Sequence, residues 1–316
     1  MRTTFTCMGC EMALWLPGDT RPDRLALHEA RHLLASIDAR LSRFDAGSEL
    51  SRLNRDPRAT VPASPLLRSA IRAACWAAER SGGLVDPALL TALQRHGYAA
   101  SLTGVAPPSL HAALAAAPAR RPARPRDGRP GWRAIEVDDA RGTIVRPPGL
   151  QLDTGGSTKG LAADAVAHVL DVYEAYVVDL GGDLRIRAPR PVEVHVEHPL
   201  TGAVAHTLAI AAGAVATSGL RRRLWRRPGG GFAHHLLDPS TGAPAWTGLV
   251  QATALAPTAL EAETLAKAAL LSGPLRARRL LAPGGGVLVH DNGSVEAVGR
   301  RARRRSLQIV QEEVAA

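Results

Sequence analysis

Leu152–Asp164, with the sequence LDTGGSTKGLAAD, is the stretch that decides the fold, because it joins a strand end to a helix start through two glycines. Glycine lets the backbone approach a ligand closely. The exposed amides at the helix start, with Lys159 beside them, form an anion site. The spacing is not that of a P-loop. These residues alone favour a phosphate-bearing ligand over a plain tight turn by a small margin.

The composition is that of a globular protein whose core is poor in aromatic residues. The chain has 316 residues, of which 46% are hydrophobic and 3% aromatic. So few aromatic residues argue against a base-stacking surface for single-stranded nucleic acid. The net charge is +10, yet only Lys159 and Lys267 are lysines among the 39 basic residues. Where lysine persists in so arginine-rich a chain, a compact ammonium is favoured over a planar guanidinium.

The three cysteines, Cys7, Cys10 and Cys75, fit a reducing compartment. Cys7 and Cys10 have C-x-x-C spacing, but a strand is expected at 11–16, so neither redox chemistry nor metal binding is favoured. No apolar run reaches the roughly 18 residues of a membrane span. The first residues lack the long apolar segment of a signal peptide. We therefore expect a cytoplasmic protein without a membrane span.

Clustered strands and several long helices predict an α+β fold. Apolar periodicity predicts helices at 22–42, 63–80, 87–95, 158–172 and 258–272. Strands are expected at 175–179, 184–188, 192–197 and 206–211, and hairpins at 132–145 and 286–298.

Two segments are rich in arginine without a recognisable nucleic-acid-binding architecture. Residues 107–131 are rich in Pro, Ala and Arg and predict a solvated loop with a short helix at 109–117. The run Arg300, Arg301, Arg303, Arg304 and Arg305 predicts a solvated basic tail. A nucleic-acid-binding function would depend on net charge alone, so no nucleic-acid partner is expected.

Seven segments, in order along the chain, resemble motifs of the FAD:protein FMN transferase family, the ApbE-like flavin transferases. They are Met8-Gly9, Ser42–Asn54, Asp86-Pro87, Leu152–Asp164, Val178–Asp183, Ser218-Gly219 with His235–Pro244, and Glu261–Ala268. Any one match is weak, but seven in the same order form a specific signal. The resemblance implies an ApbE-like (T-fold-like) α+β unit over residues 1–300, followed by a basic tail at 301–316.

The resemblance also implies a reaction. FAD is split at its pyrophosphate, FMN is joined through its phosphate to a Thr or Ser hydroxyl of a partner flavoprotein, AMP leaves, and Mg²⁺ assists. Phosphoryl transfer of this type depends mostly on positioning and charge neutralisation. The alternative is an FAD-binding protein of the same fold with weak or no transferase activity.

The resemblance assigns roles to individual residues of the expected site. Lys159 offers a point charge to FAD, and Gly156 lends a backbone carbonyl to the metal. Asp86 and Asp153 are expected to hold polar groups of the flavin or adenine portion of FAD. Apolar walls are expected from two further residues, Met8 and Phe44.

A second group of roles comes from the motifs around residues 218 and 235. His235 is the expected general base for the acceptor hydroxyl, because an imidazole titrates near neutral pH. Its structural alternative is a hydrogen bond to the Asp238-Pro239 turn. Leu236 is placed with the FAD-binding residues, and Ser218 contacts phosphate or merely turns the chain. The nearby Arg221, Arg222, Arg223, Arg226 and Arg227 flank the phosphates or an acidic partner, or form a solvated loop, which is favoured.

The chain departs from the family where the family binds magnesium. An Asp and, four residues later, a Thr are replaced by Glu263 and Lys267, and a third acid falls on Leu260. A charged lysine cannot donate a lone pair to Mg²⁺. Three interpretations remain open: an ordinary i,i+4 ion pair, an ammonium that faces the pyrophosphate in place of the metal, or Mg²⁺ held by Glu263 alone. The scarcity of lysine favours the second. Cys10, where the family has Thr, and Phe44, where it has Tyr, are milder departures.

Overall fold

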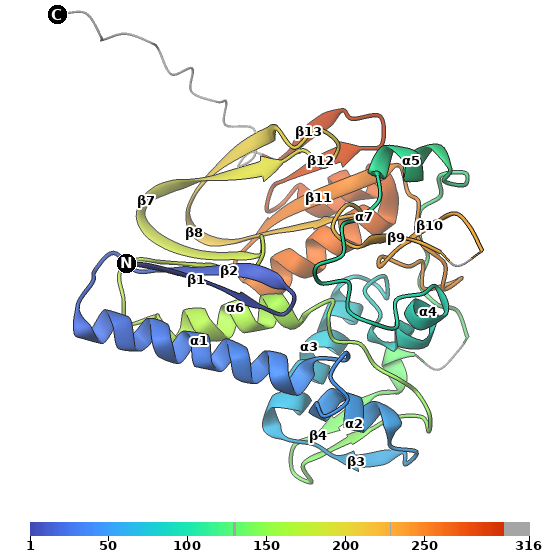
Figure 1. Cartoon of the computed structure of the whole chain (residues 1–316), viewed down its shortest axis with the longest axis horizontal. Coiled ribbons are helices and arrows are strands. Elements are labelled where there is room, and N and C mark those ends of the chain that lie inside the picture. Colours follow the sequence, from blue (N-terminus) through green and yellow to red (C-terminus); the bar gives the residue numbers. More distant parts are fainter. Residues whose placement is uncertain (129–130, 228, 300–316) are drawn as a thin grey trace, which may run out of the picture.

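The computed structural model describes residues 1–128, 131–227 and 229–299, and its largest element is an eight-stranded sheet (Figure 1). The strand order is β1-β2-β6-β7-β8-β11-β12-β13, and all neighbours are antiparallel. The strands are β1 (Arg2–Cys7), β2 (Cys10–Trp15), β6 (Tyr176–Asp179), β7 (Leu184–Glu197), β8 (Val204–Gly219), β11 (Leu249–Ala256), β12 (Gly286–His290) and β13 (Val295–Val298).

The long curved hairpin of β7 and β8 corrects the strand prediction. The two strands expected at 184–188 and 192–197 form one strand, β7, whose pairing with β8 shifts register between Arg187 and Val192. Pro189 and Pro191 lie in this interval, and proline has no amide hydrogen to donate to a neighbouring strand. The prolines therefore disturb the pairing locally without ending the strand.

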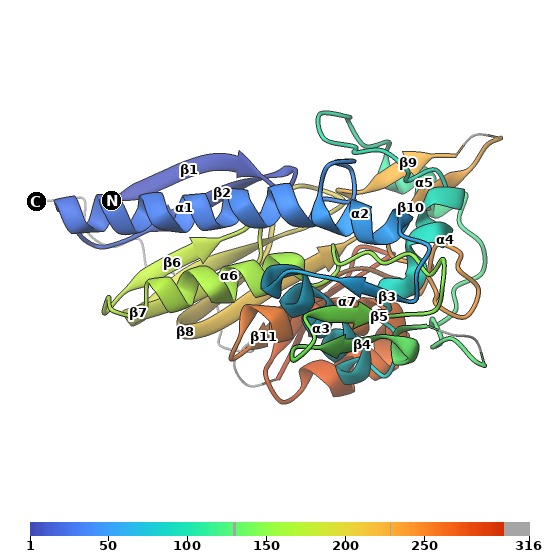
Figure 2. The same cartoon turned by 90° about the horizontal axis from the view of Figure 1, so that it is seen from below.

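Three long helices cover one face of the sheet. They are α1 (Arg21–Leu41), α6 (Thr158–Val169) and α7 (Ala259–Leu281), and Figure 2 shows α1 and α6 lying side by side along it. Helix α1 begins with a capping box formed by Thr20 and Asp23. The buried side of the helix, which includes Leu27 and Leu34, packs into the main core. The helix expected at 258–272 ends where α7 is interrupted at Gly273, which has φ 73°.

The remaining elements lie beside the helices, and most of them form a smaller lobe (Figures 1 and 2). Its three-stranded sheet, in the order β3-β5-β4, shows that the hairpin expected at 132–145 also pairs with a third strand. The elements of this lobe are α2 (Glu49–Arg55), β3 (Thr60–Pro62), α3 (Pro65–Arg80), η1 (Pro87–Leu89), α4 (Leu90–Arg95), η2 (Trp132–Ala134), β4 (Glu136–Asp138) and β5 (Thr143–Val145). Beside α7 and β11 lie three further elements, α5 (Leu110–Ala115), β9 (Leu224–Arg226) and β10 (Phe232–His234).

The loop expected to be solvated at 107–131 is instead tied to the core over part of its length. The amide of Arg121 donates to the carbonyl of Trp246, and the amide of Ala123 donates to that of Leu271. The side chain of Ala123 is buried, so this segment covers apolar surface.

The mixed α+β class is confirmed, and the helices and strands form one compact unit. Within the described ranges, no helix combines the length and apolar character needed to cross a membrane. The basic run at 300–305 and the tail at 301–316 lie outside the described residues.

Candidate active site

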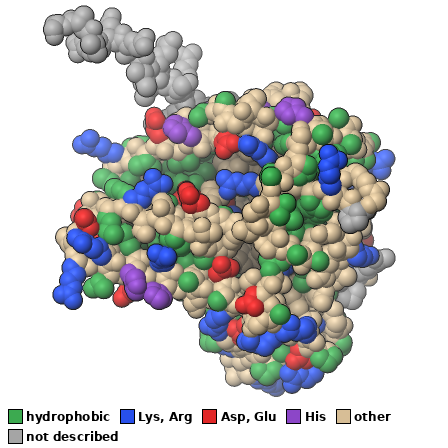
Figure 3. Space-filling model, viewed as in Figure 1, with side chains coloured by type: hydrophobic (Ala, Val, Ile, Leu, Met, Phe, Trp, Pro, Cys, Tyr) green, Lys and Arg blue, Asp and Glu red, His purple; other side chains and the backbone are tan. Residues whose placement is uncertain are grey.

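A cavity of about 980 Å³ is lined by every residue to which the sequence assigned a catalytic, FAD-binding or metal-binding role. These residues are Met8, Phe44, Asp86, Asp153, Gly156, Lys159, Ser218, His235, Leu236, Glu263 and Lys267. Arg226 and Arg227 are not among the residues that line the cavity. On the face of the molecule shown in Figure 3, basic and acidic side chains surround a hollow between the sheet and the smaller lobe. Segments far apart in the sequence therefore converge on one concave site.

The turn between β1 and β2 places Met8 at the cavity wall. Met8 has φ 50°, Gly9 has φ 70°, and the Met8 amide donates to Oδ2 of Asp38 at 2.8 Å. Burial raises the pKa of the adjacent Cys7 thiol to about 12. Since the thiolate is the reactive form, this agrees with the expectation that the C-x-x-C pair has no redox role.

Leu152 lies in a loop and not at the strand end expected from the sequence, because the preceding strand, β5, already ends at Val145. Its backbone is held by Asn54, a residue whose role the sequence did not reveal. The side chain of Asn54 accepts from the amide of Leu152 at 2.7 Å and donates to its carbonyl at 2.8 Å. The next residue, Asp153, accepts from the Gly155 amide at 2.8 Å and pairs with Arg43 at 3.2 Å. The turn that begins α6 is thus fixed from both sides before any ligand binds.

Arg43 is a further cavity residue that sequence reasoning missed. Its guanidinium lies 4.0 Å from the ring centroid of Phe44 and 4.3 Å from that of Tyr98. Its side chain is 6% exposed, and Nη2 has no hydrogen-bond partner among the described residues. The signal was present, because Arg43 precedes Phe44 in the matching motif. Such an arrangement presents a fixed cation and an unused donor beside the Phe44 wall.

Asp86 is a buried carboxylate in the cavity wall. Its Oδ1 accepts from the Ala88 amide at 2.8 Å, which caps η1, and Arg126 lies 3.6 Å from its Oδ2. Burial outweighs these contacts and raises the pKa of Asp86 above its usual range.

Lys159 lies in the first turn of α6 and forms an ion pair with Asp183. Burial by itself would lower the pKa of Lys159, but the carboxylates of Asp183 and Glu263 outweigh it and raise that pKa. The ammonium is therefore charged at neutral pH. The sequence placed Asp183 only within a motif, whereas the structure shows its side chain, 2% exposed, in contact with the lysine ammonium.

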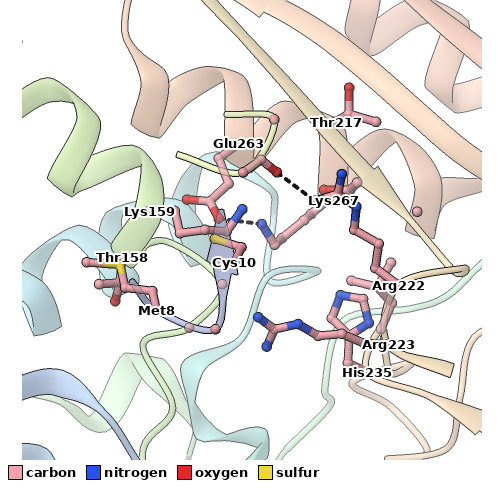
Figure 4. A pocket seen from close by; sticks show the side chains of 18 of the residues that line it. Met8, Cys10, Thr158, Lys159, Thr217, Arg222, Arg223, His235, Glu263 and Lys267 are labelled. Carbon is pink, nitrogen blue, oxygen red and sulfur yellow. Dashed lines mark hydrogen bonds and ion pairs between the residues drawn. The ribbon is translucent and has the colours of Figure 1, made fainter. Parts of the chain in front are cut away.

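The Glu263–Lys267 pair lies on the cavity side of α7, and Figure 4 shows Lys159 and Lys267 extending into the same part of the pocket beside Glu263. The Lys267 Nζ is 2.8 Å from Oε1 of Glu263, and Oε2 accepts from the Gly160 amide at 2.8 Å. The side chain of Lys267 is 11% exposed and that of Glu263 is 1% exposed. Both oxygens of Glu263 are thus engaged within the protein.

These residues do not fit the magnesium ion that the resemblance implies. The described part of the chain holds no group of three or more His, Cys, Asp or Glu that could bind a metal. Leu260, at the position of the third acid, is not among the lining residues. Unit charges 4 Å apart interact by about 4 kcal/mol at an effective dielectric of 20, so the Lys267 ammonium would repel a divalent ion there by about twice that.

His235 follows β10 and lines the cavity beside Arg223 (Figure 4). Its Nδ1 is buried without a hydrogen-bond partner among the described residues, while Asp238 accepts from Ser240 and Arg124. No hydrogen bond is found between the imidazole and the Asp238-Pro239 turn, so the geometry does not support the structural alternative.

The pKa of His235 differs from the near-neutral value expected from the sequence. Burial lowers it most, and the neighbouring Arg223, His234 and Lys267 lower it further, so that it lies well below its ordinary 6.5. The imidazole is therefore neutral at pH 7 and has a free acceptor. The low pKa also makes it a weak base until an anion enters the cavity.

Three arginines form the basic rim of the cavity, Arg221, Arg222 and Arg223. Arg221 pairs with Glu197, Arg222 donates to the carbonyl of Gly181 at 3.1 Å, and Arg223 donates to Tyr98 Oη at 2.7 Å. Arg221 and Arg222 are exposed, as a solvated loop requires, whereas Arg223 is half-buried. The site thus combines apolar walls with several fixed cations, which suits a large ligand with a phosphate-bearing centre.

Comparison with solved structures places this architecture among known folds. The ApbE protein of Thermotoga maritima is 25% identical and superposes with a TM-score of 0.77, covering 94% of this chain and 96% of that one. The flavinyl transferase ApbE of Pseudomonas stutzeri superposes with a TM-score of 0.74, with 94% of each chain covered and 23% identity.

Comparison of sequences gives the same assignment. The FAD:protein FMN transferase of Treponema pallidum is 29% identical over 265 residues, which cover 78% of this chain and 71% of that protein. The enzyme of the same name from Haemophilus influenzae is 26% identical over 261 residues, or 78% and 72% of the two chains. The ApbE family model matches residues 7–289, and the chain therefore belongs to the ApbE family, as its motifs predicted.

Proposed function

We propose that this chain is an FAD:protein FMN transferase, which moves FMN from FAD to a Thr or Ser hydroxyl of a partner flavoprotein and releases AMP. Relatives of that name align with more than three quarters of the chain, and the family model spans most of it. The observation that carries the proposal is the convergence of seven separate sequence segments on one cavity with two lysines.

Different cavity residues contact different parts of FAD. Lys159 and Lys267 face the pyrophosphate, where charge-assisted hydrogen bonds are strongest. The Phe44 ring and Met8 contact apolar parts of the flavin or adenine. Asp86 and Asp153, which hold the surrounding backbone, face polar groups of the same ligand.

The transfer step needs one proton acceptor beside the phosphorus. The acceptor hydroxyl oxygen forms a bond to the FMN phosphorus, and the bond from that phosphorus to the bridging oxygen of AMP breaks. The hydroxyl proton passes to the neutral imidazole of His235. Entry of the anionic pyrophosphate raises the low pKa of His235, because a nearby negative charge favours the imidazolium. The histidine thus becomes a stronger base when FAD is bound.

The decisive experiment mixes the purified chain with FAD and an acceptor domain, with Mg²⁺ or with EDTA. Mass spectrometry should detect covalently bound FMN on the acceptor and an equal amount of AMP. An acceptor whose target Thr is replaced by Val is the control and should stay unmodified. The absence of product with acceptors from several families would rule out the transferase.

The second candidate is an FAD-binding protein of the same fold with little or no transferase activity. It is favoured by one observation, the Glu263–Lys267 pair at the positions where the resemblance implies metal ligands. Tight FAD binding without AMP release in the same experiment would identify it.

A further inference from the structure

Both lysines of this chain end in the same cavity. Only two of the 39 basic residues are lysines, and both line the pocket (Figure 4). An ammonium is a compact charge with three donors, and it resembles a metal ion more closely than the planar guanidinium that the chain uses elsewhere.

Lys267 lies where the implied metal ligands converge. A Cβ atom placed on Gly156 would lie 3.9 Å from Cε of Lys267, so the lysine stem packs against the residue whose carbonyl the resemblance assigns to the metal. The ammonium itself is 2.8 Å from Glu263, the acidic residue of that set. The lysine therefore fills the space between Gly156 and Glu263 with a positive charge.

We propose that the Lys267 ammonium, held by Glu263, takes the place of a divalent cation and binds the FAD pyrophosphate together with Lys159, so that this chain binds FAD without magnesium. The identity of the ligand rests on the proposed function. The replacement of the metal rests on the geometry of Gly156, Glu263 and Lys267.

The hydrogen bonds of the two lysines leave donors for a phosphate. In the described part of the chain, Lys267 donates to Glu263 and Lys159 donates to Asp183, one bond each. Two of the three N–H groups of each ammonium remain for a ligand. The partner carboxylates are almost wholly buried, so they position the cations without reaching the ligand themselves.

The first test measures FAD binding to the unaltered chain by the change in flavin fluorescence, in EDTA and in MgCl₂. The expected result is the same Kd in both media. Binding that becomes about tenfold or more tighter with Mg²⁺ would overturn the inference. Failure to bind FAD in either medium would overturn the proposed function and the inference together, so the two failures are distinguishable.

The second test removes the ammonium without leaving a buried charge unpaired, which would destabilise the fold. In Glu263→Gln/Lys267→Met, Gln can still accept from the Gly160 amide, and Met keeps the length of the lysine stem. We expect FAD to bind about 10- to 100-fold more weakly, because a hydrogen bond to a charged group is lost. An unchanged Kd would contradict the inference. Arg278→Met/Glu296→Gln, which removes a more exposed ion pair outside the cavity, is the matched control and should bind FAD normally.

The third test restores the family's residue types at all three positions with Leu260→Asp/Glu263→Asp/Lys267→Thr. We expect this variant to need Mg²⁺, with a Kd about tenfold or more weaker in EDTA than in MgCl₂. Equal binding in both media would show that Lys267 does not occupy the place of a metal. Flavin fluorescence makes this readout independent of turnover.

Discussion

At the scale of single residues, the cavity is governed by side chains whose charge depends on burial. Lys159 stays charged because two carboxylates offset its loss of water, and His235 stays neutral because three cationic or basic neighbours add to the effect of burial. The same pocket thus holds a permanent cation and a neutral base. Both states suit a reaction that binds phosphates and removes a proton from a hydroxyl.

Replacement of His235 tests the assignment of the base. His235→Asn should lower kcat for FMN transfer by about 10²- to 10⁴-fold, the usual contribution of general base catalysis, and leave FAD binding nearly unchanged. Single-turnover transfer and flavin fluorescence measure the two quantities separately. His32→Asn, on the exposed side of α1, is the control. Equal losses of binding and transfer would indicate a binding role instead.

The low pKa of His235 also predicts the pH profile of transfer. A base is active when deprotonated, so its activity is lost as pH falls through its pKa. Because that pKa lies well below 6.5, kcat/KM, which reports the free enzyme, should stay level as pH is lowered through 6.5. A half-maximal value at about pH 6.5 that disappears in His235→Asn would contradict this.

His234 predicts how stability depends on pH. Burial lowers its pKa from 6.5 to about 3, so the unfolded chain takes up the proton first as pH falls. The contribution of His234 to the free energy of unfolding is complete above pH 6.5. It is lost progressively as the pH falls toward 3, by up to about 1.4 kcal/mol per pH unit. In urea unfolding between these pH values, His234→Leu should show a shallower fall in free energy than the unaltered chain. His111→Leu, at an exposed site, should not.

At the scale of elements, the contact between α6 and α7 sets the position of both lysines. A Cβ atom on Gly160 would lie 2.6 Å from Cα of Leu260 and 2.7 Å from the carbonyl oxygen of Ala259, so glycine alone allows this approach. Asp164 fixes the same crossing, because its carboxylate accepts from the Ala259 and Leu260 amides at 2.8 and 2.9 Å. The relative position of α6 and α7, which contain separate motifs, is therefore fixed by these contacts.

Gly160→Ala tests this crossing. Alanine is the better helix former, yet the added methyl must push α6 and α7 apart, so we expect a net loss of about 1–3 kcal/mol in unfolding free energy. FAD binding should weaken as well, because Lys159 and Glu263 move with the helices. Val169→Ala, at the exposed end of α6, is the control and should change stability by no more than about 0.5 kcal/mol. A more stable Gly160→Ala variant with normal FAD binding would refute the argument.

At the scale of the whole molecule, the site lies between the sheet with its helices and the smaller lobe. Asn54 of α2 joins them through its two hydrogen bonds to Leu152, next to the turn that begins α6. Arg146 stabilises the lobe side of this junction, with its buried guanidinium donating to the carbonyls of Leu53 and Leu150. The cavity shape therefore depends on polar contacts far apart in the sequence.

Asn54→Ala should loosen this junction. Two backbone groups of Leu152 lose their partner, which costs about 1–3 kcal/mol in unfolding free energy. FAD affinity should fall because Asp153 and Gly156 are no longer held in place. Thermal unfolding and flavin fluorescence measure both effects, with Gln94→Ala at an exposed position as the control. Unchanged values in both would show that the link is dispensable.

The sequence by itself determined the α+β class, most of the long helices, and a set of residues that line one cavity. These depend on local features: apolar spacing, the Gly155-Gly156 turn, and motifs whose order is preserved along the chain. The departure at Glu263 and Lys267 was also visible from the sequence, since it needs only a residue-by-residue match.

Only the tertiary structure decided how those residues meet. It joined two expected strands into β7 and showed Lys267 packed against Gly156. It also set the pKa of His235, because burial and neighbouring charges come from segments distant in the sequence. The sequence names the groups, whereas their distances and protonation depend on long-range packing that no local pattern encodes.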